Sequence, residues 1–162
     1  MHERPTPQHA FLTRLVGEWT ADFAADMGPD QPQHASAGRE RVRLLGEFWA
    51  VCEGEIGGVE GNKHVTVMTL GYDAADQRFV GTFVGSMMSH LWHYTGTLDA
   101  AGNVLTLLTE GPSFHEPGKT APYRDVIEFF SDDQRTLTSH TPLPDGTWKA
   151  FMTARYRRLH LP

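Results

Sequence analysis

Two glutamates, Glu40 and Glu53, offer the clearest chemistry in this sequence. Gly46-Glu47 suits a two-residue type II′ turn, which would pair residues 36–45 with residues 48–56 as a hairpin. In that register Glu40 lies directly opposite Glu53, on the face that carries the apolar residues of both strands. Two facing carboxylates repel each other, so either one is protonated or a cation lies between them. The sequence therefore predicts an inward carboxylate pair.

Arg124, in the segment 121–130, is the candidate cation for this pair, and a histidine or a polar ligand could also fill that role. Two ordinary arrangements compete with the coupled pair. Both glutamates could be solvated near a strand end, or a β-bulge could turn one of them outward.

Other patterns for chemistry are missing from the sequence. His90 and His93 are three residues apart on an expected strand and would point to opposite faces, so they form a poor metal chelate. His9 is expected at the surface. Cys52 is the single cysteine and cannot form an internal disulfide or a thiolate metal cage. There is no nucleophile elbow and no phosphate-binding glycine loop. We predict no catalytic residue, metal or cofactor from motifs.

Composition limits the class of protein. The chain has 162 residues and a formal net charge of −6, which argues against binding to a nucleic-acid backbone. No apolar run reaches the roughly 18–20 residues that a membrane-spanning helix needs. The polar first residues do not look like a signal peptide. We therefore expect a cytoplasmic protein with one domain over residues 1–162 and no membrane contact.

The spacing of apolar residues and turn signals predicts an all-β fold. Residues 7–16 form the one helical pattern, with Thr6 as its N-cap and Gly17 as its end. After it, turn residues separate short strand-like runs in a manner typical of a barrel. We predict an up-and-down antiparallel β-barrel of about ten strands, with the short N-terminal helix at one end. The expected strands are 18–27, 36–45, 48–56, 63–71, 78–85, 91–98, 103–110, 121–130, 135–141 and 147–157.

Large and small residues alternate on the faces expected to point inward. Three such faces are Phe79/Gly81/Phe83/Gly85, Trp92/Tyr94/Gly96/Leu98 and Trp148/Ala150/Met152/Ala154/Tyr156. The small residues either let aromatic rings interlock or leave space for a ligand. The irregular segment 111–119 is either a lid at the barrel mouth or an ordinary surface crossover. The candidate ligand-binding residues are Trp49, Glu40, Glu53, Phe83, Trp92, Tyr94, Arg124 and Met152.

Several motifs resemble known families. Gly17-Glu18-Trp19 after a short helix resembles the start of calycins, the group of lipocalins and fatty-acid-binding proteins. A larger set resembles a bacterial family named domain of unknown function 1579, from Gln8 to Arg158. This resemblance implies a calycin-like antiparallel barrel and carries over no activity or catalytic residue. The motifs are Glu40-Arg41-Val42-Arg43, Met68-Thr69-Leu70-Gly71-Tyr72-Asp73, Phe79-Val80-Gly81-Thr82, Gly85-Ser86-Met87-Met88, Leu98-Asp99-Ala100-Ala101-Gly102, Thr109-Glu110-Gly111-Pro112, Tyr123-Arg124-Asp125-Val126-Ile127-Glu128 and Phe151-Met152-Thr153-Ala154-Arg155-Tyr156-Arg157-Arg158.

Three functions remain open from the sequence. The favoured one is non-enzymatic binding of a small, mainly apolar molecule inside the barrel. The second is an enzyme that uses Glu40 and Glu53 as acid and base on a ligand in the cavity. The third is a filled barrel that acts through its outer face, on a protein partner or as a homodimer. An open cavity would favour the first, and a solid core the third.

Overall fold

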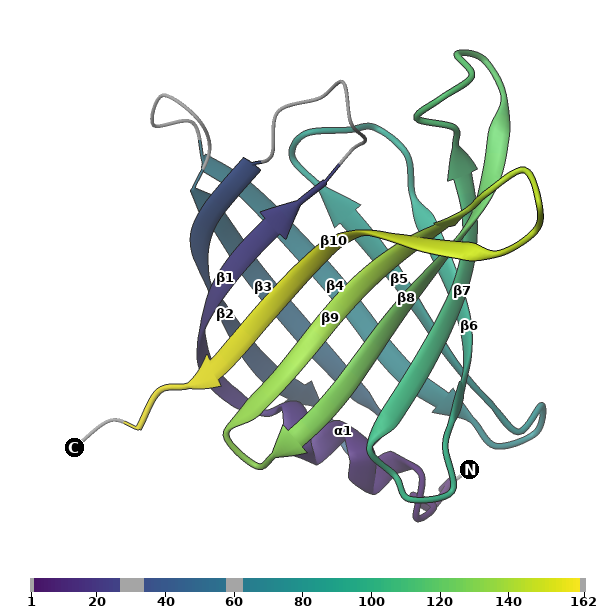
Figure 1. The fold of residues 1–162 in the computed structure, drawn as a ribbon. Coiled ribbons are helices and arrows are strands. Elements are labelled where there is room, and N and C mark those ends of the chain that lie inside the picture. Colours follow the sequence, from purple (N-terminus) through teal and green to yellow (C-terminus); the bar gives the residue numbers. More distant parts are fainter. Residues whose placement is uncertain (1, 27–33, 58–62, 161–162) are drawn as a thin grey trace.

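Ten antiparallel strands form a closed barrel in the computed structural model, which describes residues 2–26, 34–57 and 63–160 (Figure 1). Each strand pairs with its neighbours in sequence, and β1 pairs with β10 to close the barrel. The predicted all-β up-and-down barrel with one short helix is confirmed. The elements are α1 (His9–Leu15), β1 (Gly17–Ala25), β2 (His34–Leu45), β3 (Trp49–Gly57), β4 (Lys63–Asp73), β5 (Arg78–Gly85), β6 (Trp92–Leu98), β7 (Val104–Pro112), β8 (Thr120–Ser131), β9 (Gln134–Pro142) and β10 (Trp148–Arg158).

The predicted strand limits lie within about two residues of the observed ones, because turn residues mark them clearly. The last residue of the predicted strand 18–27 lies outside the described residues. The helix begins later than predicted, with Gln8 rather than Thr6 at its N-cap. No helix in the described part of the chain is long and apolar enough to span a membrane.

His9, the first residue of α1, corrects a prediction. Its ring is buried rather than exposed. The Thr6 backbone N–H donates to His9 Nδ1 at 2.8 Å, and Nε2 lies 3.1 Å from the Tyr72 carbonyl oxygen. The ring also packs edge-on against Phe48 and Tyr72. The side chain therefore ties the residues before the helix to β4, a contact that sequence spacing does not show.

Helix α1 lies across one end of the barrel, at the bottom of Figure 1. Its buried residues Phe11, Leu12 and Leu15 point into the core, and Phe11 packs edge-on against Phe129 of β8. The indole of Trp19, which is fully buried, donates from Nε1 to the Leu15 carbonyl oxygen at 2.8 Å. Apolar packing and this hydrogen bond close this end of the barrel.

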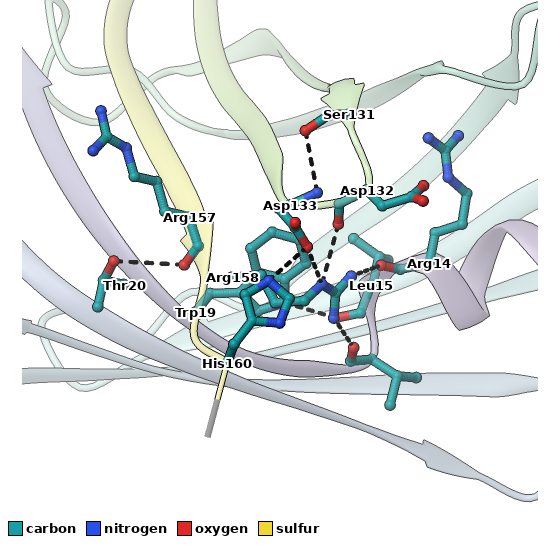
Figure 2. Close-up of polar contacts among 11 residues, drawn as sticks. Arg14, Leu15, Trp19, Thr20, Ser131, Asp132, Asp133, Arg157, Arg158 and His160 are labelled. Carbon is teal, nitrogen blue, oxygen red and sulfur yellow. Dashed lines mark hydrogen bonds and ion pairs between the residues drawn. The ribbon is translucent and has the colours of Figure 1, made fainter. Parts of the chain in front are cut away.

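Arg158, the last residue of β10, binds the C-terminal end of α1 (Figure 2). Its guanidinium donates to the carbonyl oxygens of Val16 and Arg14, the latter at 2.7 Å, and lies 4.2 Å from the centre of a Trp19 ring. The same group donates to the Asp132 carbonyl oxygen at 3.1 Å. A cation suits these acceptors because the last carbonyl groups of a helix have no partner within the helix.

Candidate functional site

The hairpin of β2 and β3 has a different register from the predicted one. Leu45 pairs with Trp49 across a three-residue loop, whereas the predicted turn had two residues. The added residue shifts every pair by one, so Glu40 faces Gly54 and Glu53 faces Arg41. Neighbouring residues of a strand point to opposite faces, and the shift therefore separates the two glutamates. The predicted Glu40/Glu53 pair is wrong, and the acid–base enzyme that depends on it loses its premise.

Glu53 lies on the outer face of the barrel. Its side chain is 53% exposed and lies 3.9 Å from Arg43 as a solvated ion pair. Trp49 also lies outside, 40% exposed, and covers Gly71, where a Cβ atom would lie 2.5 Å from the indole ring. Neither residue reaches the barrel interior, contrary to the expectation for a ligand site.

Glu40 points inward and forms a buried ion pair with Arg135 of β9. The side chain of Arg135 is 3% exposed and that of Glu40 is 15% exposed. The guanidinium carbon also lies 4.5 Å from the centre of the Trp19 ring and 3.9 Å from that of Tyr156. The cation that neutralises the inward glutamate is therefore Arg135. Trp19, which contacts Arg135, also donates to the Leu15 carbonyl oxygen of α1. The ion pair is thus connected to the packing of this helix, which indicates a role in stability.

Arg124, the predicted cation, lies on the outer face. It stacks on Trp148 with its guanidinium carbon 4.9 Å from the ring centre. A β-bulge between Ala150 and Met152 reverses the alternation of β10. For that reason Trp148 leaves the predicted inward face, while Met152, Ala154 and Tyr156 keep it. The bulge also brings Phe151 to the mouth of the barrel.

A pocket of about 200 Å³ lies at the end of the barrel opposite α1. Its wall carries four of the candidate ligand-binding residues, Phe83, Trp92, Tyr94 and Met152. We call it the mouth pocket. The other residues that line it are Met68, Met87, Met88, Thr109, Phe114, Tyr123, Asp125, Leu137, Ser139 and Phe151.

The rim of the mouth pocket is held by specific contacts. The Phe114 backbone N–H donates to the Tyr123 hydroxyl at 3.1 Å, and that hydroxyl donates to the Pro112 carbonyl oxygen at 2.8 Å. The Trp92 indole N–H donates to the Met88 sulfur at 3.0 Å. The segment 111–119, one of whose predicted alternatives was a lid, thus contributes Phe114 to the pocket.

Polar side chains from four strands, β6 to β9, meet on one wall of the mouth pocket. The Tyr94 hydroxyl donates to Asp125 Oδ2 at 2.5 Å, and Ser139 also bonds to this carboxyl group. The Thr109 hydroxyl oxygen is buried and has no hydrogen-bond partner among the described residues. Loss of water raises the pKa of Asp125 above its usual range, although Tyr94, Ser139 and the charge of His140 oppose that shift. The wall thus places an acidic group in apolar surroundings.

A second, smaller cavity of about 90 Å³ lies deeper in the barrel. Glu40, Arg135 and Cys52 are among the residues that line it. Four side chains line both this cavity and the mouth pocket: Met68, Phe83, Leu137 and Met152. Burial raises the pKa of the Cys52 thiol, and so Cys52 is a poor nucleophile. Among the described residues, no three His, Cys, Asp or Glu side chains are grouped to hold a metal ion.

At Gly81 and Gly96 the structure shows a role that differs from both alternatives expected for the small residues, which were interlocking of rings and space for a ligand. A Cβ atom at Gly96 would lie 2.5 Å from the Thr106 carbonyl oxygen, and one at Gly81 would overlap the Thr69 carbonyl. At Gly111 it would overlap the Trp92 ring. These glycines therefore allow close approach of a strand or a ring. The space for a ligand comes from the separation of the larger side chains around the mouth pocket.

Sequence reasoning missed Asp125 and Arg135 as interior residues. A signal existed for Asp125, because it alternates with the buried residues Tyr123 and Ile127 in β8. Arg135 likewise alternates with Leu137 in β9. The charge of both side chains hides this signal, because a charged residue is normally expected to face water.

Comparison with solved structures supports the fold. The crystal structure of Rv2717c from M. tuberculosis has a TM-score of 0.67 at 13% identity, covering 97% of this chain and 100% of that chain. The S-type phycobiliprotein lyase CPES from Guillardia theta has a TM-score of 0.57 at 17% identity, covering 94% of this chain and 93% of that chain. The barrel EF1p2_mFAP2b, bound to DFHBI, has a TM-score of 0.50 at 12% identity, covering 94% of this chain and 99% of that chain.

The sequence comparison gives one family. The model of a family described as "Protein of unknown function (DUF1579)" matches residues 4–158. No curated protein matches the sequence.

Proposed function

The chain belongs to the DUF1579 family, and we propose that it binds a small, mainly apolar molecule without covalent chemistry, in the mouth pocket of its barrel. The observation that supports this most is the pocket itself, which combines an apolar wall with a small group of polar side chains. That combination is typical of small-molecule sites, where apolar area provides affinity and a few polar groups fix orientation.

The rim of the pocket gives further support. Met87, Met88 and Phe114 are 39%, 37% and 46% exposed, so large apolar side chains surround the opening. Apolar side chains gathered around a concave surface usually mark a place where something binds. Methionine is also common in sites that adapt to ligand shape.

The structural neighbours add a weaker argument. A barrel of similar fold is bound to DFHBI, and another is a phycobiliprotein lyase. Fold likeness alone transfers no ligand, and the proposal therefore depends on the side chains of this chain. In it, Phe83, Trp92 and Met152 form the apolar wall, and Tyr94 fixes the polar group. Glu40 borders the deeper cavity rather than the mouth pocket and is paired there with Arg135.

Binding of the uncharged fluorescent probe Nile red tests the proposal. The native protein should take up the probe with saturable, blue-shifted emission, because the pocket excludes water. Thr109→Phe should abolish this signal, since it fills the pocket and removes a hydroxyl that has no partner in the described part of the chain. Thr95→Phe is the matched control, because it adds the same ring at an exposed position on the neighbouring strand β6.

Thermal unfolding of both variants shows that each is folded before binding is compared. Overpacking typically lowers stability by about 1–3 kcal/mol, which leaves most of the fold intact. Equal signals from the native protein and Thr109→Phe would reject the mouth pocket as the site. No saturable signal from the native protein would reject the proposal and favour the third function considered above, a barrel that acts through its outer face.

A further inference from the structure

Charge is distributed unevenly over the wall of the mouth pocket. Of its lining residues, all within the described part of the chain, Asp125 is the one with a formally charged side chain. It receives hydrogen bonds from Tyr94 and Ser139, both of which are neutral donors. By contrast, Glu40 in the deeper cavity has Arg135 as an ion-pair partner. Glu40 thus has a guanidinium as its ion-pair partner, whereas Asp125 has two neutral donors and the charge of His140, which lies outside the pocket lining and opposes the rise of the Asp125 pKa.

An ionised carboxylate in an apolar pocket is unfavourable unless a positive charge lies nearby. Loss of water disfavours the charged form of Asp125, as the direction of its pKa shift indicates. A bound cation would replace the lost solvation. An uncharged ligand would not stabilise the ionised form of Asp125 in this way, and an anionic ligand would repel it.

The aromatic side chains of the pocket point to the same ligand charge. Trp92 and Tyr123 have ring centres 5.4 Å apart, and Phe114 lies 5.1 Å from Tyr123 and 5.8 Å from Phe151. The faces of aromatic rings carry negative electrostatic potential and attract organic cations, as in aromatic cages for ammonium groups. The four rings also provide the apolar area for the body of such a ligand.

We infer that the mouth pocket selects an organic ammonium ion, whose apolar body packs among these rings and whose protonated amine donates to the carboxylate of Asp125. This inference rests on the proposed function and names its ligand class. The Thr109 hydroxyl, which lacks a partner among the residues that the structure describes, provides a further acceptor on the same wall. Three features of separate origin, namely a carboxylate with neutral hydrogen-bond donors, a ring cluster and this hydroxyl, fit one chemical group.

Three probes of similar size test the charge preference: phenethylamine, phenethyl alcohol and phenylacetate. Their binding is measured by displacement of Nile red at mildly alkaline pH, where the amine is protonated and phenylacetate is ionised. The amine should bind at least tenfold more tightly than the alcohol, since a hydrogen bond to a charged partner is stronger than a neutral one. Phenylacetate should bind most weakly because its charge is repelled.

Asp125→Asn tests the residue. This variant keeps the shape of the side chain and an acceptor for Tyr94 but removes the charge. The amine should lose at least tenfold in affinity, while the alcohol should change by less than about twofold. Glu128→Gln is the control, because it makes the same charge change on the same strand, at a position that does not line the pocket.

The outcomes separate the two proposals. If the alcohol binds as tightly as the amine to the native protein, or if Asp125→Asn leaves the amine preference intact, the ammonium inference is overturned and the binding function stands. If Nile red does not bind saturably to the native protein, both proposals fail; if it binds but none of the three probes displaces it, the ammonium inference alone is overturned. The comparison of the three probes on the native protein decides the charge preference even if Asp125→Asn does not fold.

Discussion

The buried ion pair of Glu40 and Arg135 leads to a quantitative prediction. Replacing Arg135 with Met would leave the Glu40 carboxylate, 15% exposed, without its cation inside the barrel. Removal of one partner of a buried pair typically lowers the free energy of unfolding by about 3–5 kcal/mol. Arg135→Met also loses the cation–π contacts with Trp19 and Tyr156. For a domain of this size we expect the melting temperature to fall by roughly 6–20 °C.

An exposed ion pair provides the matched control. Arg41 Nη2 lies 2.8 Å from Glu18 Oε1, with side chains 70% and 33% exposed. Because water solvates both groups, Arg41→Met should lower the free energy of unfolding by less than about 1 kcal/mol. The two arginines thus differ mainly in burial.

A double-mutant cycle in urea unfolding completes the assay. Glu40→Leu combined with Arg135→Met should be clearly more stable than the sum of the single effects predicts, since neither variant side chain is charged. A change in the free energy of unfolding under about 0.5 kcal/mol for Arg135→Met, as at ordinary surface positions, would contradict a stabilising buried ion pair. A coupling energy no larger than that of the Glu18–Arg41 pair would contradict it as well.

Two further outcomes are expected. Arg158→Met should lower the free energy of unfolding by roughly 2–3 kcal/mol, because carbonyl groups at the end of α1 lose a charged donor; a change below about 0.5 kcal/mol in urea unfolding would contradict this. For Asp125, burial raises the pKa in the folded state above its ordinary value of 3.8. The contribution of Asp125 to the free energy of unfolding is therefore complete below pH 3.8 and is lost as the pH rises through the raised pKa. Asp125→Asn should therefore be at least as stable as the native protein at neutral pH, and the difference should shrink or reverse on acidification; a difference independent of pH would count against the shift.

The fold was predictable because its signals are local. Turn residues separate the strands, and alternation within a strand assigns faces without knowledge of its partners. For this reason the ten strands and the inward positions of Phe83, Trp92 and Tyr94 follow from the sequence. The same logic applied to Asp125 would have placed it inside the barrel.

The site depended on features that act between strands. A three-residue loop in place of a two-residue turn moved Glu53 to the outer face, because a shift of one residue reverses every later side chain relative to its partner. A bulge in β10 had a similar effect on Trp148. Closure of the barrel brought Arg135 to Glu40 across 95 residues of sequence. Sequence by itself determined the number and order of the strands. Register, bulges and closure of the barrel decided which charged side chains meet inside it, because those pairings depend on distances between strands that no local pattern encodes.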